Sequence, residues 1–476
     1  MSAKYKLFLF IGILLLLTGC ADEKMSPGNE TPTRTARSNS TSNSPIIAST
    51  IPPSTPSPIP SSPSMAPSLL PTNSASEHGS PNLKITKLQM FDAKTGWALH
   101  VDYLSPEFQD VKILRTGDGG QTWKNVSPPT PAEYGNLPEV AFLDAKTAFA
   151  IFSKTGLPAS TETESTIRRT MDGGQTWQTG DTLILDQAPM IGVSQLVMLD
   201  QNHGWMLGTS DEVMGRSSVT LYTTEDGGMH WNAIYNTNTY SQIDDPNTLW
   251  AFSNFPYGDR LFTFLTSSIG FYSNGELFLT QYGGTSWQKQ TLPIPADLPN
   301  LGSQIEQNKV FSTISLPRFV TPQDGVLTRR FYPRSQVTIP PGSYSGLPMA
   351  EYLYFTHDGG QTWISHPSPT RIGGVYFLDA QAGWFLGKDD ANPANFTQLY
   401  QTSDGGYTWT QIDATSPIPL GSQIQFVDKN TGFAFTPAWA GYVLGDLDQR
   451  SNNARGIFTT TDGGQTWEKV TPQLVP

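Results

Sequence analysis

Short apolar runs alternate with turn residues along most of the chain, from Pro81 to Pro476. Between Leu137 and Gly180, for example, the runs read LPEVAFLD, TAFAIFS, STIRRT and TWQTG. Such short runs, rich in Val, Ile, Phe and Leu and bounded by Gly, Asp and Ser, favour β-strands. No stretch of this region sustains the 3.6-residue periodicity of an amphipathic helix. The pattern therefore predicts repeated units of four short strands.

An octapeptide of the form TxDGGxTW marks each unit. Its seven near-copies end at Trp123, Trp177, Trp231, Trp287, Trp363, Trp409 and Trp467. The third positions of successive copies are 54, 54, 56, 76, 46 and 58 residues apart, a period that indicates a repeat architecture. A second motif, such as FLDAQAGWFLG from Phe377, precedes each copy. We therefore predict an all-β fold over residues 81–476, a seven-bladed β-propeller of four-stranded antiparallel blades whose radial closure hides the sheet edges.

The residues of the octapeptide suit a hairpin joint. The paired glycines, Gly119 and Gly120 in the first copy, permit the positive φ of a tight turn, the Asp accepts backbone N–H groups, and the Trp packs over the turn. The aspartates are Asp118, Asp172, Asp226, Asp358, Asp404 and Asp462. In the remaining copy Tyr282 replaces the carboxylate, which a repeated binding site would not tolerate and a structural turn would. Repeated calcium or ligand sites are the alternative interpretation.

The octapeptide resembles the Asp-box, or BNR repeat, which is found in sialidases, in sortilin-type receptors and in the photosystem II stability and assembly factor family. The paired FxDxxxGW and TxDGGxTW unit looks most like that last family, of the WD40/YVTN/BNR-like class, and the resemblance covers nearly all of residues 83–470. It implies a seven-bladed propeller in the extracytoplasmic space. It implies less about function, because one propeller scaffold serves many activities.

The first 80 residues predict an export signal and a stalk. Lys4 and Lys6 precede an apolar run from Leu7 to Leu17, which is too short to span a bilayer, and residues 1–20 therefore read as a signal peptide. The sequence LTGC resembles the bacterial lipobox, so we expect Cys20 to receive a lipid and to anchor the protein to the membrane. Residues 21–80 contain 33 Ser, Thr or Pro residues and no aromatic residue, which predicts a disordered linker.

Charge and motif content narrow the function. From residue 81 onward, 24 Lys and Arg stand against 37 Asp and Glu, a net charge of about −13 that disfavours nucleic acid as a partner. The six histidines lack metal-ligand spacing, and no Gly-rich phosphate loop or nucleophile elbow occurs. We therefore expect no metal and no cofactor, and a monomeric protein.

Binding residues are expected on one end of the propeller, the variable-loop face. The FxDxxxGW turn and the octapeptide turn lie at the same end of a blade, so the connections that vary in length lie at the opposite end, where binding residues concentrate. Two clusters in the long connections are candidates: Arg329, Arg330, Phe331, Tyr332 and Arg334, and Tyr240, Trp250, Phe255 and Tyr257. The first suits an acidic group and the second suits stacking on carbohydrate or peptide rings. Local salt bridges in the first and a small satellite core in the second are the alternatives.

These observations predict a lipid-anchored, extracytoplasmic propeller that acts as a non-catalytic binding, assembly or scaffold module for an envelope protein or polysaccharide. The alternative is a glycoside hydrolase, sialidase-like or another Asp-box glycosidase, that uses carboxylates on the variable-loop face. Candidates by location are Asp211, Glu212, Asp244, Asp245, Asp389 and Asp390. The "RIP" sequence typical of sialidases is absent from the chain. Both terminal units are complete, so the sequence does not indicate how the ring closes.

Overall fold

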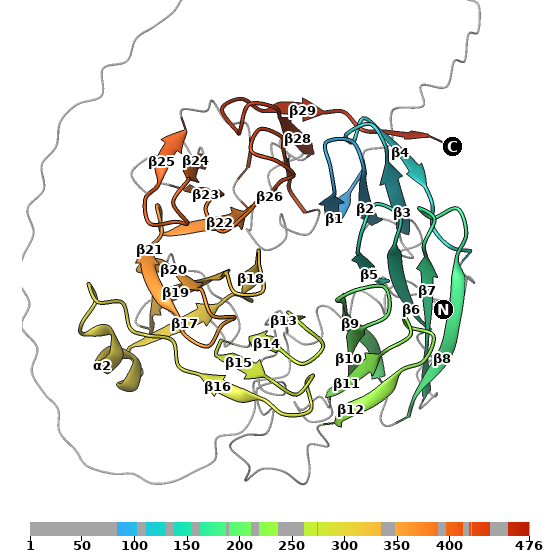
Figure 1. Cartoon of the computed structure of the whole chain (residues 1–476), viewed down its shortest axis with the longest axis horizontal. Helices are drawn as coiled ribbons and strands as arrows, with labels where there is room; N and C mark the ends of the chain where they lie inside the picture. Colours follow the sequence, from blue (N-terminus) through green and yellow to red (C-terminus); the bar gives the residue numbers. More distant parts are fainter. Residues whose placement is uncertain are drawn as a thin grey trace, which may run out of the picture. The chain divides into compact units, whose positions relative to one another are not determined.

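Each predicted unit forms one antiparallel sheet whose strands are adjacent in the order of the chain. The computed structural model describes residues 83–101, 111–129, 138–154, 162–186, 190–210, 219–236, 261–273, 275–334, 348–388, 397–412, 418–419, 421–437 and 456–475. These residues form seven sheets, arranged as blades around a common centre (Figure 1). The prediction of a seven-bladed propeller of four-stranded antiparallel blades is confirmed.

The blades follow one another along the chain, and in each blade except blade 5, where β18 is innermost, the first strand lies nearest the centre (Figure 1). Blade 1 comprises β1 (Ile85–Met90), β2 (Gly96–Val101), β3 (Val111–Thr116) and β4 (Thr122–Asn125), and blade 2 comprises β5 (Glu139–Phe142), β6 (Ala148–Lys154), β7 (Glu162–Thr170) and β8 (Gln178–Asp186). Blade 3 comprises β9 (Met190–Met198), β10 (Gly204–Ser210), β11 (Val219–Thr224) and β12 (Asn232–Asn236), and blade 4 comprises β13 (Leu261–Phe264), β14 (Gly270–Ser273), β15 (Leu277–Thr280) and β16 (Gln288–Gln290).

The remaining blades keep this order, with additions in blade 5. That blade comprises β17 (Val310–Ile314), β19 (Gly325–Pro333), β20 (Ala350–Thr356) and β21 (Ile364–Pro367), and the short β18 (Arg318–Phe319) also pairs with β19. Blade 6 comprises β22 (Ile372–Phe377), β23 (Gly383–Lys388), β24 (Thr397–Thr402) and β25 (Thr410–Ile412), and blade 7 comprises β26 (Gln423–Phe426), β27 (Gly432–Phe435), β28 (Ile457–Thr460) and β29 (Glu468–Val470). The helix α2 (Leu301–Glu306) precedes blade 5. Among the described residues, no helix is long and apolar enough to cross a membrane.

The two predicted kinds of turn lie at one end of the blades, which we call the turn face. In blade 1, residues 91–95 join β1 to β2, and residues 117–121 join β3 to β4. Gly119 and Gly120 adopt φ values of 77° and 89°, and the paired glycines of the other six copies also have positive φ. An L-residue other than Gly rarely adopts this backbone region, so the glycine pair fixes the turn geometry.

Aromatic stacking joins neighbouring blades. The Trp of the FxDxxxGW motif stacks on a Phe of the next blade in three places: Trp97 on Phe142, Trp205 on Phe264 and Trp384 on Phe426. Each indole also donates to a carbonyl in a turn of the next blade, at 2.9 to 3.0 Å. All three rings are buried. The core of the propeller is therefore divided among the interfaces between blades, and the second motif supplies inter-blade joints.

The ring closes at its inner and outer edges. Near the centre, the Gln425 side chain accepts the Met90 N–H at 3.0 Å and donates to the Met90 carbonyl, which joins β26 to β1. At the periphery, β30 (Gln473–Val475) leaves blade 7 and pairs in parallel with β4 (Figure 1). Leu474 packs against the apolar cluster shared by blades 1 and 7. We call β30 the latch strand, because it makes the chain following blade 7 a fifth strand of blade 1.

Candidate functional site

The octapeptide turns are held by their own side chains. In blade 1, Asp118 Oδ1 accepts the Thr116 hydroxyl and the Thr122 N–H, both at 2.9 Å, and Oδ2 accepts the Thr122 hydroxyl at 2.6 Å. The Thr116 hydroxyl accepts the Gly120 N–H at 2.9 Å. Four further turns repeat these bonds around Asp172, Asp358, Asp404 and Asp462. Both oxygens of each carboxylate are thus used within the turn.

These bonds keep the carboxylates ionised. The hydroxyl and N–H of Thr176 lower the pKa of Asp172 to about 2, and those of Thr408 lower the pKa of Asp404 to about 2. A carboxylate that accepts several hydrogen bonds is stabilised in its charged form. At neutral pH the ionised carboxylates therefore stabilise their own turns.

The two turns that depart from the pattern show which bonds are essential. In blade 3, the His230 ring takes the place of the Thr hydroxyl, with Nδ1 2.5 Å from Asp226 Oδ2 and Nε2 3.3 Å from Asp181 Oδ2. In blade 4, Tyr282 provides no carboxylate, yet the Thr280 hydroxyl still accepts the Gly284 N–H at 3.0 Å. The fold of the turn therefore depends on the Thr and Gly pair more than on the Asp.

The predicted basic and aromatic cluster lies in a strand and not in a loop. Residues 325–333 form β19, because their backbone pairs with β17 on one side and with β20 on the other. Phe331 is fully buried, and Arg329, which is 8% exposed, donates from Nε to the Ser312 hydroxyl at 3.1 Å. Three members of the cluster reach the surface: Arg330 and Tyr332 are partly exposed, and Arg334 is exposed. The expectation that all five residues belong to a long loop is thus corrected, while a binding role for them stays a prediction.

Arg330 faces an unexpected buried acid. Its guanidinium forms an ion pair with Glu351, which lies in β20, and also donates to the Gly373 carbonyl of blade 6. The Glu351 side chain is 0% exposed, and its Oε1 has no hydrogen-bond partner among the described residues. Burial raises the pKa of Glu351 to about 7 despite the neighbouring Arg330. Arg330 is therefore part of the interface between blades 5 and 6.

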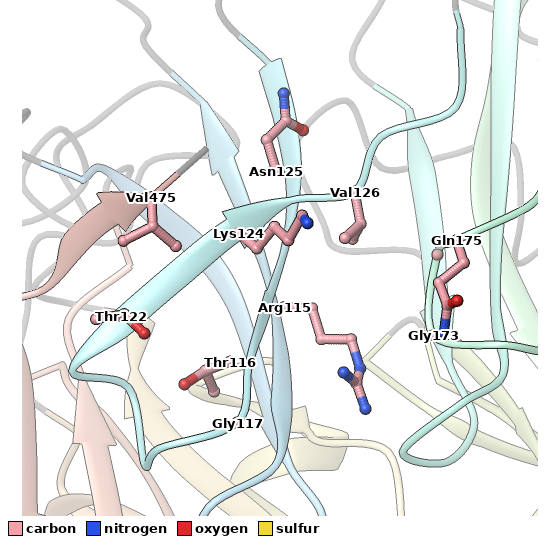
Figure 2. A pocket seen from close by; sticks show the side chains of 11 residues that line it. Arg115, Thr116, Gly117, Thr122, Lys124, Asn125, Val126, Gly173, Gln175 and Val475 are labelled. Atoms are coloured by element: carbon pink, nitrogen blue, oxygen red, sulfur yellow. The ribbon is translucent and has the colours of Figure 1, made fainter.

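A cavity of about 590 Å³ lies between blades 1 and 2, and we call it the outer pocket (Figure 2). Figure 2 shows Arg115 on β3 and Lys124 on β4 in the middle, Gly173 and Gln175 of the blade 2 turn on one side, and Val475 of the latch strand on the other. The lining residues include no carboxylate and no aromatic ring; they are Arg115, Thr116, Gly117, Thr122, Lys124, Asn125, Val126, Gly173, Gly174, Gln175 and Val475. The sequence pattern does not reveal this pocket, because its walls come from three separate segments of the chain.

The chain matches no protein-family model and no curated protein. Its structure is similar to several solved propellers. The structure of YCF48 bound to D1 peptide shares 16% identity, with a TM-score of 0.42, over 74% of this chain and 88% of that one. Polysaccharide lyase Uly1 shares 9%, with a TM-score of 0.42, over 74% and 85%. The GH74 enzyme of Niastella koreensis shares 12%, with a TM-score of 0.30, over 81% and 56%. These likenesses concern the fold alone.

Several predicted residues lie outside the described part of the chain. They include Cys20, both segments before residue 81, the aromatic candidates Tyr240, Trp250, Phe255 and Tyr257, and the six candidate carboxylates from Asp211 to Asp390. Among the residues that the structure does describe, no group of three or more His, Cys, Asp or Glu side chains is placed to hold a metal ion.

Proposed function

We propose that the protein is a non-catalytic binding module, anchored outside the cytoplasm by a lipid on Cys20, that holds an envelope protein or polysaccharide on its variable-loop face. One observation supports this proposal above others, namely the contrast between the two ends of the propeller. The octapeptide turns are short and closed by their own hydrogen bonds. At the opposite end, the connections differ widely in length: residues 274–276 join β14 to β15, whereas residues 436–456 join β27 to β28. Loops that vary on a rigid scaffold are where binding residues concentrate.

Tyr332 and Arg334 are the described side chains best placed for this role. They lie at the end of β19, where the chain enters the long connection to β20 at the variable-loop face. The Tyr332 ring stacks on Phe311 at 5.1 Å, and the Arg334 guanidinium lies 5.3 Å from the same ring. A guanidinium held by an aromatic face is ordered before a ligand arrives, which favours recognition of an acidic group.

Partner capture from the native envelope, quantified by mass spectrometry, tests the binding role. We expect the double substitution Tyr332→Ala and Arg334→Ala to lower the yield of specific partners about tenfold, while Lys94→Ala on the turn face leaves it unchanged. Arg330 is unsuitable for this test, because its removal would leave the buried Glu351 carboxyl unpaired. Equal capture by the double variant and the wild type would contradict binding through β19.

A screen of fluorogenic glycosides with the full-length protein tests the non-catalytic role. We expect no turnover above a heat-denatured control. Turnover that is lost on changing Asp389 or Asp390 would instead support the glycoside hydrolase interpretation.

Membrane fractionation of the Cys20→Ser variant tests the anchor. We expect the variant to appear in the soluble extracytoplasmic fraction, because a lipid cannot attach without the thiol. Retention in the membrane at the wild-type level would contradict lipidation.

A further inference from the structure

The outer pocket lies beside a turn in which the octapeptide Trp makes an unusual hydrogen bond. In five turns, the Trp indole donates to the carbonyl of the second glycine of its own turn, at 2.9 to 3.1 Å. In blade 2, Trp177 donates instead to the Val126 carbonyl of blade 1, at 2.8 Å. This bond ties the residue after β4 to the turn of blade 2. The outer pocket occupies the angle between them, since Val126, Gly173 and Gly174 all line it.

The two cations of the pocket have spare hydrogen-bonding capacity. Arg115 donates from Nε and Nη2 to the Ala145 carbonyl, each at 3.2 Å, and its Nη1 makes no hydrogen bond with the described residues. The exposed Lys124 ammonium has no hydrogen-bond or ion-pair partner within the same part of the chain. The acids of the adjoining turns, Asp118 and Asp172, bond to their own threonines and are not among the residues that line the pocket. The lining therefore carries two cations and no carboxylate, on a chain with a net charge of −12.

We propose that the outer pocket binds a small anionic ligand that carries phosphate or carboxylate groups. Arg115 fixes the orientation, since two of its nitrogens are already bound, and Lys124 supplies a mobile second charge. A volume of about 590 Å³ is in the range of small-molecule sites. The lack of aromatic rings among the lining residues disfavours a stacked sugar and leaves charge recognition as the source of affinity.

This site is separate from the variable-loop face and has its own structural consequence. Val475 of the latch strand lines the pocket, and in the β4 and β30 pairing it lies opposite Lys124. A ligand held by Lys124 therefore contacts the latch strand, which closes the ring. Since a ligand that binds the folded state stabilises it, occupancy raises the temperature at which the latched ring unfolds.

Titration calorimetry and thermal denaturation of the full-length protein test the site. The probes are inorganic phosphate and citrate up to about 5 mM, a range in which binding is separable from the general salt effect, with KCl at matched ionic strength as the reference. We expect a saturable rise in Tm of about 2 to 4 °C with at least one probe. A response to phosphate alone identifies phosphate compounds as the ligand class, and a response to citrate alone identifies carboxylates.

Three variants locate the effect. We expect Lys124→Gln to weaken binding about tenfold. We expect Asn125→Asp, which keeps an acceptor for the Ser127 N–H but adds a negative charge to the wall, to weaken it further. Lys94→Gln, at an exposed lysine in the turn between β1 and β2 of the same blade, is the matched control and should bind as the wild type does. Binding of neither probe, or equal binding by Lys124→Gln, would overturn the proposal.

Discussion

At the scale of single residues, the octapeptide turn divides its work between backbone geometry and hydrogen bonding. The glycine pair sets the positive φ values, and the Thr hydroxyl and Asp carboxylate satisfy N–H groups that the turn would otherwise leave unpaired. The turn of the fourth blade keeps the glycine pair and the Thr280 hydroxyl bond but lacks the carboxylate bonds, because Tyr282 stands where six copies have Asp. Blade 4 therefore shows the turn as it forms without the Asp carboxylate.

Restoring the carboxylate should stabilise blade 4. Tyr282 is 67% exposed, so Tyr282→Asp removes little packing, and Ser286 stands four residues later, where other turns supply the N–H and hydroxyl that Asp accepts. We expect a gain in the free energy of unfolding of about 0.5 to 1.5 kcal/mol, measured by urea denaturation. Tyr282→Ala is the control, and an equal effect of the two substitutions would show that the carboxylate adds nothing.

The turn tryptophans should differ in their contribution to stability. Trp123 is fully buried, so Trp123→Ala should cost about 3 to 5 kcal/mol. Trp177 is partly exposed and bonds across to blade 1, so Trp177→Ala should cost on the order of 1 to 2 kcal/mol. Urea denaturation of both variants gives the comparison, and a larger loss for Trp177→Ala would contradict it.

At the scale of elements, the strand order follows from local chemistry, whereas long-range pairing does not. The four-stranded units and both turns were predictable, because Gly, Asp and Thr act on residues no more than four positions away. The extension of β19 through Arg329 and Arg330 was not predictable, because a segment that reads as a polar loop becomes a strand only by pairing with β17 and β20. The latch strand was not predictable either, because three residues carry no repeat signal and their partner β4 is remote in sequence.

The latch strand should be necessary for the stability of blade 1. Leu474→Asp places a charge beside the apolar cluster that blades 1 and 7 share, and we expect a loss of about 2 kcal/mol. Hydrogen exchange at the amides of Thr122–Asn125 should accelerate, because β4 would become an edge strand. Gln473→Asp, an exposed position in the same strand, is the control. Unchanged exchange in β4 would mean that β30 does not hold the outer edge.

At the scale of the whole molecule, buried and exposed acids act in opposite directions as pH changes. The turn carboxylates Asp172 and Asp404, with pKa values of about 2, favour the folded state above the ordinary pKa of 3.8, and this contribution is lost as the pH falls towards 2. Glu351, with a pKa of about 7 against an ordinary 4.5, favours the folded state while it is protonated. Its contribution is complete below pH 4.5 and is lost as the pH rises towards 7.

Stability should therefore be greatest near pH 4 to 5. Between pH 4.5 and 7, we expect the free energy of unfolding of the wild type to fall by about 2 to 3 kcal/mol from Glu351 alone. Glu351→Gln stays neutral at every pH and should reduce this slope, leaving the part due to Glu139, whose pKa burial also raises to about 7. Glu276→Gln, at an exposed acid paired with Lys289, is the control and should leave the slope as in the wild type. Urea denaturation at several pH values provides the measurement, and equal slopes for Glu351→Gln and the wild type would contradict the assignment.

The latch strand also sets the order of events while the chain is being made. Strand β4 precedes β30 by about 350 residues, so the outer edge of blade 1 stays unpaired until all six later blades have been synthesised. An unpaired edge attracts other strands, and closing so long a loop is slow. The first blade to emerge is thus the last to be completed. The time taken to make the chain, and not only its final contacts, defines the interval in which this protein is most exposed to mispairing.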